Sequence, residues 1–169
     1  IPSGSIKFVN WFFKAQELSY PPALDYPTEL LPYLNRQVLR TTLSTLLASW
    51  GPNGPSSPLF IKPVIQKAFT GFVLQPEGWV TQLSDIDPNQ EVWTSEVIPD
   101  IQSEWRVFVL DKRILDIRPY RQTFSDYLNF MPSEVALLNE MIEAFTSAPR
   151  SYSLDIALAL EWVKGCGQY

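Results

Sequence analysis

Apolar and polar positions along this chain indicate two helices, with short strands between and after them. Four apolar residues recur at roughly the helical period of 3.6, namely Leu31, Leu34, Val38 and Leu46. With Thr28 as the expected N-cap and the Gly- and Pro-rich segment 51–55 as a stop, they predict one helix from 28 to about 50. A second helix is predicted to begin at Pro132-Ser133, since later apolar residues line one face: Val135, Leu138, Ile142 and Phe145.

Short apolar runs predict the strands. They cover 59–65, 71–74, 91–98, 104–110, 113–117 and 151–162. The clearest run has Trp105, Val107 and Val109 at alternate positions, and Asp111-Lys112 is expected to turn it back as a hairpin. Together these elements predict an α+β fold with antiparallel sheets and flanking helices.

The first part of the chain is predicted to differ from the rest. Ile6 to Phe13 is a short apolar segment that fits either a strand or the start of a helix. Residues 19–27 contain three prolines and are predicted to form an extended linker. We therefore expect an N-terminal helical and linker lobe over 1–58 and a second unit over 59–169.

Composition narrows the chemistry. The net charge of −5 disfavours a nucleic-acid binder, whose footprint is basic. Absence of histidine excludes Ser–His–Asp catalysis, Cys–His catalysis and His-ligated zinc, and the single Cys166 excludes an intrachain disulfide. A metal would be held mainly by carboxylates, which suits Mg²⁺. With no membrane-spanning apolar run and no signal peptide, we expect a cytoplasmic protein without a membrane partner.

Lys62 lies within an apolar run, where a buried ammonium group costs free energy unless an anion pairs with it. One interpretation is an edge strand, which Pro63 favours, with the lysine reaching solvent. The other is a phosphate site shared with Lys67, whose turn ends in Gly71 and lets the backbone approach phosphate oxygens. It is not a Walker A loop, because the Gly-Lys-Ser/Thr ending is absent. Spacing alone leaves both open.

A second candidate group lies on the predicted hairpin and the last strand. Glu104 and Arg106 are two positions apart on one strand and therefore share a face. Arg118, at the end of the next strand, is expected near them. Such a face suits a polyanion, because arginine binds phosphate or acyl phosphate through paired hydrogen bonds, but a solvated ion-pair face is the alternative. Asp155 is either a metal ligand or a solvent-exposed residue.

In this order the segments resemble the ATP-grasp superfamily, and within it a branch of small bacterial and phage-encoded peptide ligases. The segments are Phe60-Ile61-Lys62-Pro63, Lys67-Ala68-Phe69-Thr70-Gly71, Ser95-Glu96-Val97-Ile98, Glu104-Trp105-Arg106-Val107-Phe108-Val109 and Tyr152-Ser153-Leu154-Asp155. The resemblance covers roughly 27–157. It implies an ATP-grasp-like fold that holds ATP between two lobes, with 59–169 as the nucleotide-binding core.

The resemblance also implies which residues meet the cofactor. Lys62, Lys67 and Gly71 would hold the ATP phosphates. The segment Glu96-Val97-Ile98 would be the hinge that meets the adenine.

Catalytic roles follow in the same way. Arg106 and Arg118 would stabilise the transferring phosphate and the acyl phosphate, and Glu104 would orient Arg106 or a substrate amine. Asp155 would be the first Mg²⁺ ligand. Family members complete the metal site with a later Glu-x-Asn motif, which the chain lacks up to Tyr169, so we expect a core truncated at its C-terminal end.

The resemblance implies an ATP-dependent ligase. ATP would phosphorylate the carboxylate of a small molecule or peptide, and an amine would attack the acyl phosphate. Phosphoryl transfer needs positioning and charge neutralisation, so the lack of histidine is no obstacle. Two alternatives stay open: a non-catalytic ATP-grasp-like module that binds a nucleotide or a protein, and an interaction domain with an aromatic protein-binding patch.

Overall fold

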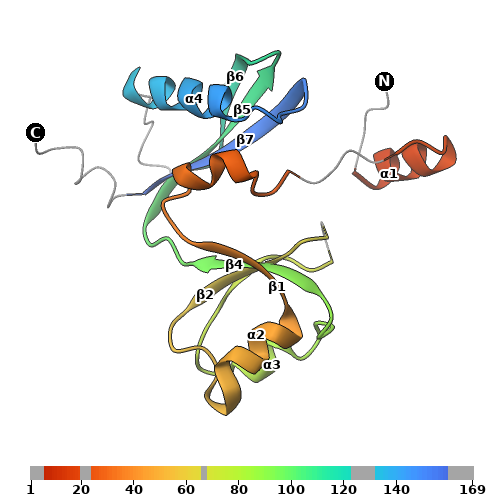
Figure 1. Ribbon diagram of the computed structural model, residues 1–169, viewed down its shortest axis with the longest axis vertical. Coiled ribbons are helices and arrows are strands. Elements are labelled where there is room, and N and C mark those ends of the chain that lie inside the picture. Colours follow the sequence, from red (N-terminus) through yellow and green to blue (C-terminus); the bar gives the residue numbers. More distant parts are fainter. Residues whose placement is uncertain (1–5, 20–23, 66–67, 123–131, 160–169) are drawn as a thin grey trace, which may run out of the picture.

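The computed structural model describes residues 6–19, 24–65, 68–122 and 132–159 of the chain. Within them, a four-stranded and a three-stranded antiparallel sheet each pack helices against one face (Figure 1). The predicted α+β class with antiparallel sheets and flanking helices is therefore confirmed. Near the N-terminus, helix α1 spans Ile6–Ala15, which decides between the strand and helix interpretations of that segment.

The four-stranded sheet has the strand order β1-β4-β2-β3. Its strands are β1 (Val38–Thr42), β4 (Glu91–Glu96), β2 (Leu59–Pro63) and β3 (Phe72–Leu74). Ile61, Leu74 and Val92 share one face and are buried in a core with helices α2 (Leu43–Trp50) and α3 (Trp79–Leu83). Because side chains alternate along a strand, the intervening residues occupy the opposite face.

The single helix predicted from 28 to 50 is wrong. The segment forms the 3-10 helix η1 (Thr28–Tyr33), then β1, then α2. Thr28 is the first residue of η1 rather than its N-cap. β1 exists because each of its residues pairs with β4, a long-range contact that overrides the local helical period. The predicted end at Trp50 holds, since the 3-10 turn η2 (Gly51–Asn53) follows.

The three-stranded sheet has the order β6-β5-β7. The strands are β5 (Ile101–Leu110), β6 (Arg113–Gln122) and β7 (Ser151–Ala159). Asp111 and Lys112, between β5 and β6, have φ values of 49° and 60°. Two successive positive φ angles are typical of a tight hairpin turn whose twist matches that of the strands. The predicted hairpin is therefore confirmed.

Helix α4 (Pro132–Ala144) covers one face of the three-stranded sheet (Figure 1). Val107 and Val109 of β5 are buried in one core with Leu138 and Ile142 of the helix, as strand alternation and helical period predicted. Leu30 of η1 joins this core, so the segment before β1 is anchored on the three-stranded sheet. The polar residues of β5 lie on the opposite face.

The chain passes between the two sheets through residues 34–37 and 97–100 (Figure 1). β1, from the first of the two predicted units, pairs with β4 from the second. The division at residue 58 stays a prediction. Among the described helices, none has the length and apolar character needed to cross a bilayer.

Candidate functional site

Three residues line up on the face of the four-stranded sheet that points away from α2 and α3. Arg40 of β1 pairs with Trp93 of β4, and Trp93 pairs with Lys62 of β2. Directly opposed residues on antiparallel strands share a face and lie close together. The edge-strand interpretation of Lys62 is wrong, because β2 lies between β4 and β3. Pro63 is accommodated since the pairing with β3 ends at Ile61.

Lys62 is largely withdrawn from water and has an anionic partner. Its Nζ donates a hydrogen bond to Oδ1 of Asp25 at 2.6 Å and lies 4.4 Å from the centre of the Tyr26 ring. The side chains of Lys62 and Asp25 are 24% and 20% exposed, so the pair balances charge where solvation is weak. A phosphate oxygen has the charge and acceptor capacity to replace the carboxylate here.

A cavity of about 380 Å³ lies beside this ion pair. Its walls are Leu24, Asp25, Tyr26, Pro27, Thr28, Glu29, Arg40, Val64, Trp93, Phe145 and Ser147. Phe145 belongs to the core of the three-stranded sheet, so elements of both sheets bound the cavity. Ligand pockets typically measure roughly 300–1,000 Å³, and the cavity therefore suits a small molecule or part of a nucleotide.

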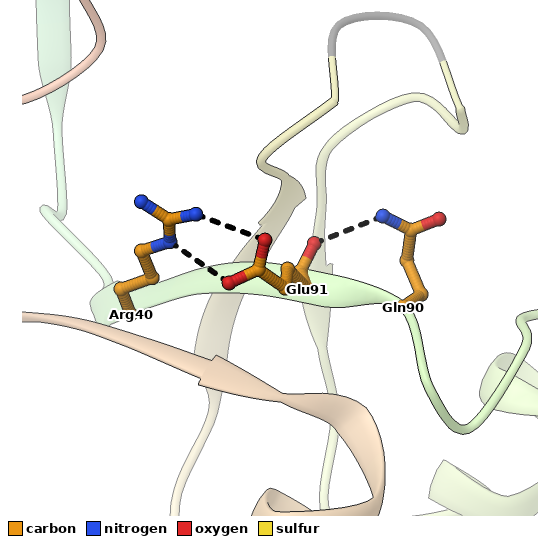
Figure 2. Close-up of polar contacts among 3 residues, drawn as sticks. All are labelled: Arg40, Gln90 and Glu91. Carbon is orange, nitrogen blue, oxygen red and sulfur yellow. Dashed lines mark hydrogen bonds and ion pairs between the residues drawn. The ribbon is translucent and has the colours of Figure 1, made fainter.

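Arg40, in the cavity wall, is held in place by Glu91 (Figure 2). Its Nε and Nη2 donate to the two carboxylate oxygens at 3.1 Å and 2.9 Å. These hydrogen bonds lower the pKa of the Glu91 carboxyl and raise the pKa of Arg40. The Gln90 side-chain amide donates to the backbone oxygen of Glu91 at 3.0 Å. The guanidinium carbon of Arg40 lies 5.9 Å from the centre of a Trp93 ring, and a fixed cation therefore flanks that indole.

The second group of predicted site residues lies on the open face of the three-stranded sheet. Arg106 donates from Nε and Nη2 to both oxygens of Asp155, at 2.7 Å each. Arg118, opposite Arg106 on β6, donates from Nε to Asp116 at 2.6 Å. Glu104 shares this face by strand alternation. The structure thus brings the carboxylates and guanidinium groups together, in an arrangement that fits both a polyanion site and a solvated ion-pair face.

Two predicted phosphate residues stand differently. Lys67 lies outside the described residues, and its position relative to Lys62 stays a prediction. Gly71 lies against β2: a Cβ there would be 3.0 Å from Cβ of Lys62 and 3.1 Å from Cζ of Phe60. Packing beside Lys62 therefore requires a residue without a side chain at this position, whatever its part in binding.

The predicted hinge Glu96-Val97-Ile98 begins at the last residue of β4. Oε2 of Glu96 accepts a hydrogen bond from the Gln37 backbone N–H at 3.1 Å. This contact joins the two segments that pass between the sheets. The hinge is thus correctly placed between the two units, and its contact with adenine stays a prediction.

Asp155 is the implied metal ligand, and Arg106 occupies both of its oxygens. In the part of the chain that the structure describes, no group of three or more acidic, cysteine or histidine side chains could hold a metal ion. Mg²⁺ commonly takes one or two carboxylates and completes its shell with phosphates and water. Asp155 fits such an ion only as one of its ligands, and only if Arg106 yields an oxygen.

Sequence reasoning missed the neighbours of Lys62. Asp25 and Tyr26 lie in the segment interpreted as linker, and Asp25 is 37 positions away, so no local pattern points to the pair. Arg40 and Trp93 would have been found by strand pairing, had β1 been predicted. The missing signal was the alternation of Val38, Arg40 and Thr42, hidden inside an apparent helical period.

The two sheets define the ATP-grasp class of proteins. D-alanine–D-alanine ligase from Bacillus anthracis is similar, with a TM-score of 0.52 at 14% identity over 78% of this chain and 51% of that one. ATP-grasp ligase PsnB complexed with minimal precursor, Mg and ADP gives 0.48 at 14% identity over 74% and 41%. At such identities the likeness concerns the fold alone. This chain spans about half, or less, of those proteins.

The family is shown by sequence. The chain belongs to the ATP-grasp domain, R-to-K clade family 2, whose family model matches residues 33–163. The resemblance stated from the motifs is therefore confirmed. No curated protein sequence matches the chain.

Proposed function

We propose that this chain is the nucleotide-binding core of an ATP-dependent ligase that joins a carboxylate to an amine through an acyl phosphate. Family membership supports ATP as the phosphoryl donor. The similar Bacillus anthracis protein is a D-alanine–D-alanine ligase, which supports carboxylate–amine joining as the reaction class. The observation that carries the proposal is the weakly solvated ammonium of Lys62, held by one carboxylate beside a cavity of about 380 Å³.

The proposed reaction has two steps. A substrate carboxylate oxygen attacks the γ-phosphorus of ATP, the bond to the β-phosphate oxygen breaks, and ADP leaves. An amine then attacks the carbonyl carbon of the acyl phosphate, loses a proton and expels inorganic phosphate. Both steps develop negative charge on phosphate oxygens, so fixed cations are the protein's main contribution.

The residues of this chain divide that work between the two sheets. Lys62, with Lys67, would neutralise the phosphates, and Gly71 would leave room beside them. The hinge Glu96-Val97-Ile98 would receive the adenine between the sheets. Each role extends the placement of the residue and is part of the proposal.

On the three-stranded sheet, Arg106 and Arg118 would bind the transferring phosphate. Arginine suits this role because its fork donates two parallel hydrogen bonds to phosphate oxygens. Glu104, on the same face, would orient Arg106 or accept a proton from the amine. Mg²⁺ bound with ATP would supply further charge neutralisation, with Asp155 as the ligand from this chain. Small molecules or peptides would be the substrates, and the cytoplasm the location.

Calorimetric titration of ATP with Mg²⁺ into the chain tests the proposal, using Lys62→Gln and Lys112→Gln as a matched pair. Both lysines pair with a carboxylate, Lys112 with Glu143 at 2.9 Å at the hairpin turn. We expect Lys62→Gln to weaken ATP binding roughly tenfold or more, as for a lost charged hydrogen bond, and Lys112→Gln to have no effect. Equal affinities for the two variants, or no ATP binding by the wild type, would contradict the proposal.

A second candidate function is a module that binds nucleotide without catalysis. Saturation of both Asp155 oxygens by Arg106 favours it. ATP binding without ADP release, in the presence of varied carboxylates and amines, would select this alternative. ADP release that depends on an added carboxylate would select the ligase.

A further inference from the structure

Four residues, 24–27, lie against the face of the four-stranded sheet that carries Lys62 and Trp93; we call them the strap. Asp25 pairs with Lys62 at 2.6 Å. The Tyr26 ring lies 5.0 Å from the Trp93 ring in an edge-on arrangement and 4.4 Å from the Lys62 ammonium. The strap therefore contacts both side chains at once.

Trp93 carries an unanswered polar group under the strap. Its indole Nε1 is buried and has no hydrogen-bond partner among the described residues. A buried donor without a partner costs free energy, and such groups are rare in folded proteins. The indole N–H can only donate, so the group that would satisfy it is an acceptor such as a phosphate or ribose oxygen.

The position of Trp93 suits a nucleotide laid along β4. Trp93 is three residues before Glu96, where the proposed hinge begins, and directly opposite Lys62. Three residues of a strand extend roughly 10 Å. A nucleotide with its base at the hinge would therefore place its sugar and first phosphates beside Trp93 and Lys62.

We propose that Trp93 is a further nucleotide-contacting residue, and that the strap covers it together with Lys62 until the nucleotide takes the strap's place. The inference rests on the proposed nucleotide site. A phosphate oxygen would replace the Asp25 carboxylate on Lys62, so the ammonium keeps an anion in both states. The indole N–H would gain an acceptor only in the nucleotide-bound state. The strap thus competes with the nucleotide and reduces its apparent affinity by the fraction of molecules that are closed.

Calorimetric titration of ATP with Mg²⁺ into the full chain and five variants tests this proposal. Asp25→Asn and Tyr26→Ala each loosen the strap, and Trp93→Phe keeps an aromatic ring while removing the N–H. If about nine molecules in ten are closed, Asp25→Asn and Tyr26→Ala tighten ATP binding roughly tenfold. Trp93→Phe weakens it roughly tenfold, as expected for one lost hydrogen bond to a charged group.

The two controls are Asp111→Asn and Trp79→Phe. Asp111 pairs with Arg150 at 2.6 Å at the hairpin turn, and Trp79 packs against Trp50 on the helix side of the sheet. Both should bind ATP as the wild type does. Circular dichroism of every variant confirms folding, and Tyr26→Ala tests the strap independently of Asp25.

The outcomes separate this inference from the proposed function. Tighter binding by both strap variants and weaker binding by Trp93→Phe support it, as does ATP binding seen only after the strap is loosened. Wild-type binding that both strap variants weaken or leave unchanged overturns the strap, and unchanged binding by Trp93→Phe overturns the contact. No ATP binding by any variant overturns the proposed function itself, and this inference with it.

Discussion

Lys62 Nζ lies 2.6 Å from the carboxylate of Asp25, although 37 positions separate the two residues in the chain. The contact joins the segment before η1 to an interior strand of the four-stranded sheet. It gives a half-buried cation its counter-ion, and it does so on the sheet face where the ATP-grasp fold is proposed to receive phosphates. The pair is therefore important to stability as well as to binding.

Breaking this pair should destabilise the fold measurably. With both side chains about three-quarters buried, we expect Asp25→Ala and Lys62→Ala each to lower the unfolding free energy by roughly 1–2 kcal/mol, because each leaves an unpaired charge in a weakly solvated place. In a double-mutant cycle by chemical denaturation, the coupling should be about 1 kcal/mol. The exposed Lys112–Glu143 pair is the control, with an expected coupling below about 0.5 kcal/mol. Equal couplings would contradict the prediction.

Asp155→Asn should separate binding from stability. Its ion pair with Arg106 is 44% exposed on both sides, so the unfolding free energy should change by no more than about 0.5 kcal/mol. If Asp155 takes part in holding Mg²⁺ with ATP, the same change should weaken Mg²⁺-dependent ATP binding roughly tenfold, as for one lost charged contact. Asp116→Asn, on the same sheet face, is the matched control. Identical binding by both variants would remove Asp155 from the site.

Thr42→Ala tests where α2 begins. The Thr42 Oγ1 accepts a hydrogen bond from the Thr45 N–H at 3.2 Å, so the substitution removes an N-cap and should cost about 1 kcal/mol of unfolding free energy. Ser44→Ala, within the first turn of α2, is the control and should change stability less. A stabilising effect of Thr42→Ala would instead fit an uninterrupted helix, in which alanine is the better residue.

Tyr152→Phe should stabilise the protein and alter its response to alkaline pH. The Tyr152 hydroxyl is buried without a partner among the described residues, and its ring packs edge-on against Phe145 at 5.3 Å. Removing an unsatisfied hydroxyl while keeping the ring should raise the unfolding free energy by roughly 1 kcal/mol. Thermal melts in neutral buffer measure this gain.

The pH dependence has a definite sign. Burial, and secondarily the charge of Glu143, raises the pKa of Tyr152 above its usual value of 10.0. The folded state therefore holds the phenolic proton more tightly than the unfolded state. This contribution to stability is complete below pH 10 and is lost as the pH rises through the folded pKa. Melts from pH 9 upward should show a smaller alkaline loss for Tyr152→Phe than for the wild type, and identical curves would contradict the assignment.

Much of this protein could be predicted from local pattern. The alternation from Glu104 to Leu110 and the turn at Asp111-Lys112 predicted the hairpin, because burial of one sheet face imposes a period of two. The same sheet carries Arg106 and Asp155, so strand alternation and motif order were enough to find that group of site residues. The ordered motifs also identified the ATP-grasp family, which the family model confirms.

Long-range contacts decided the rest. Val38 to Thr42 has a helical period in isolation, yet pairing with β4 makes it a strand and places Arg40 beside Trp93. Asp25 has no local feature that marks it as the partner of Lys62. A sequence specifies its local periods directly, whereas the partner of a half-buried charge depends on which distant segments the packing of two sheets brings together. The sequence alone therefore determined the family, the hairpin and most of the candidate residues, and only the tertiary structure showed that a strap of four residues lies over Lys62.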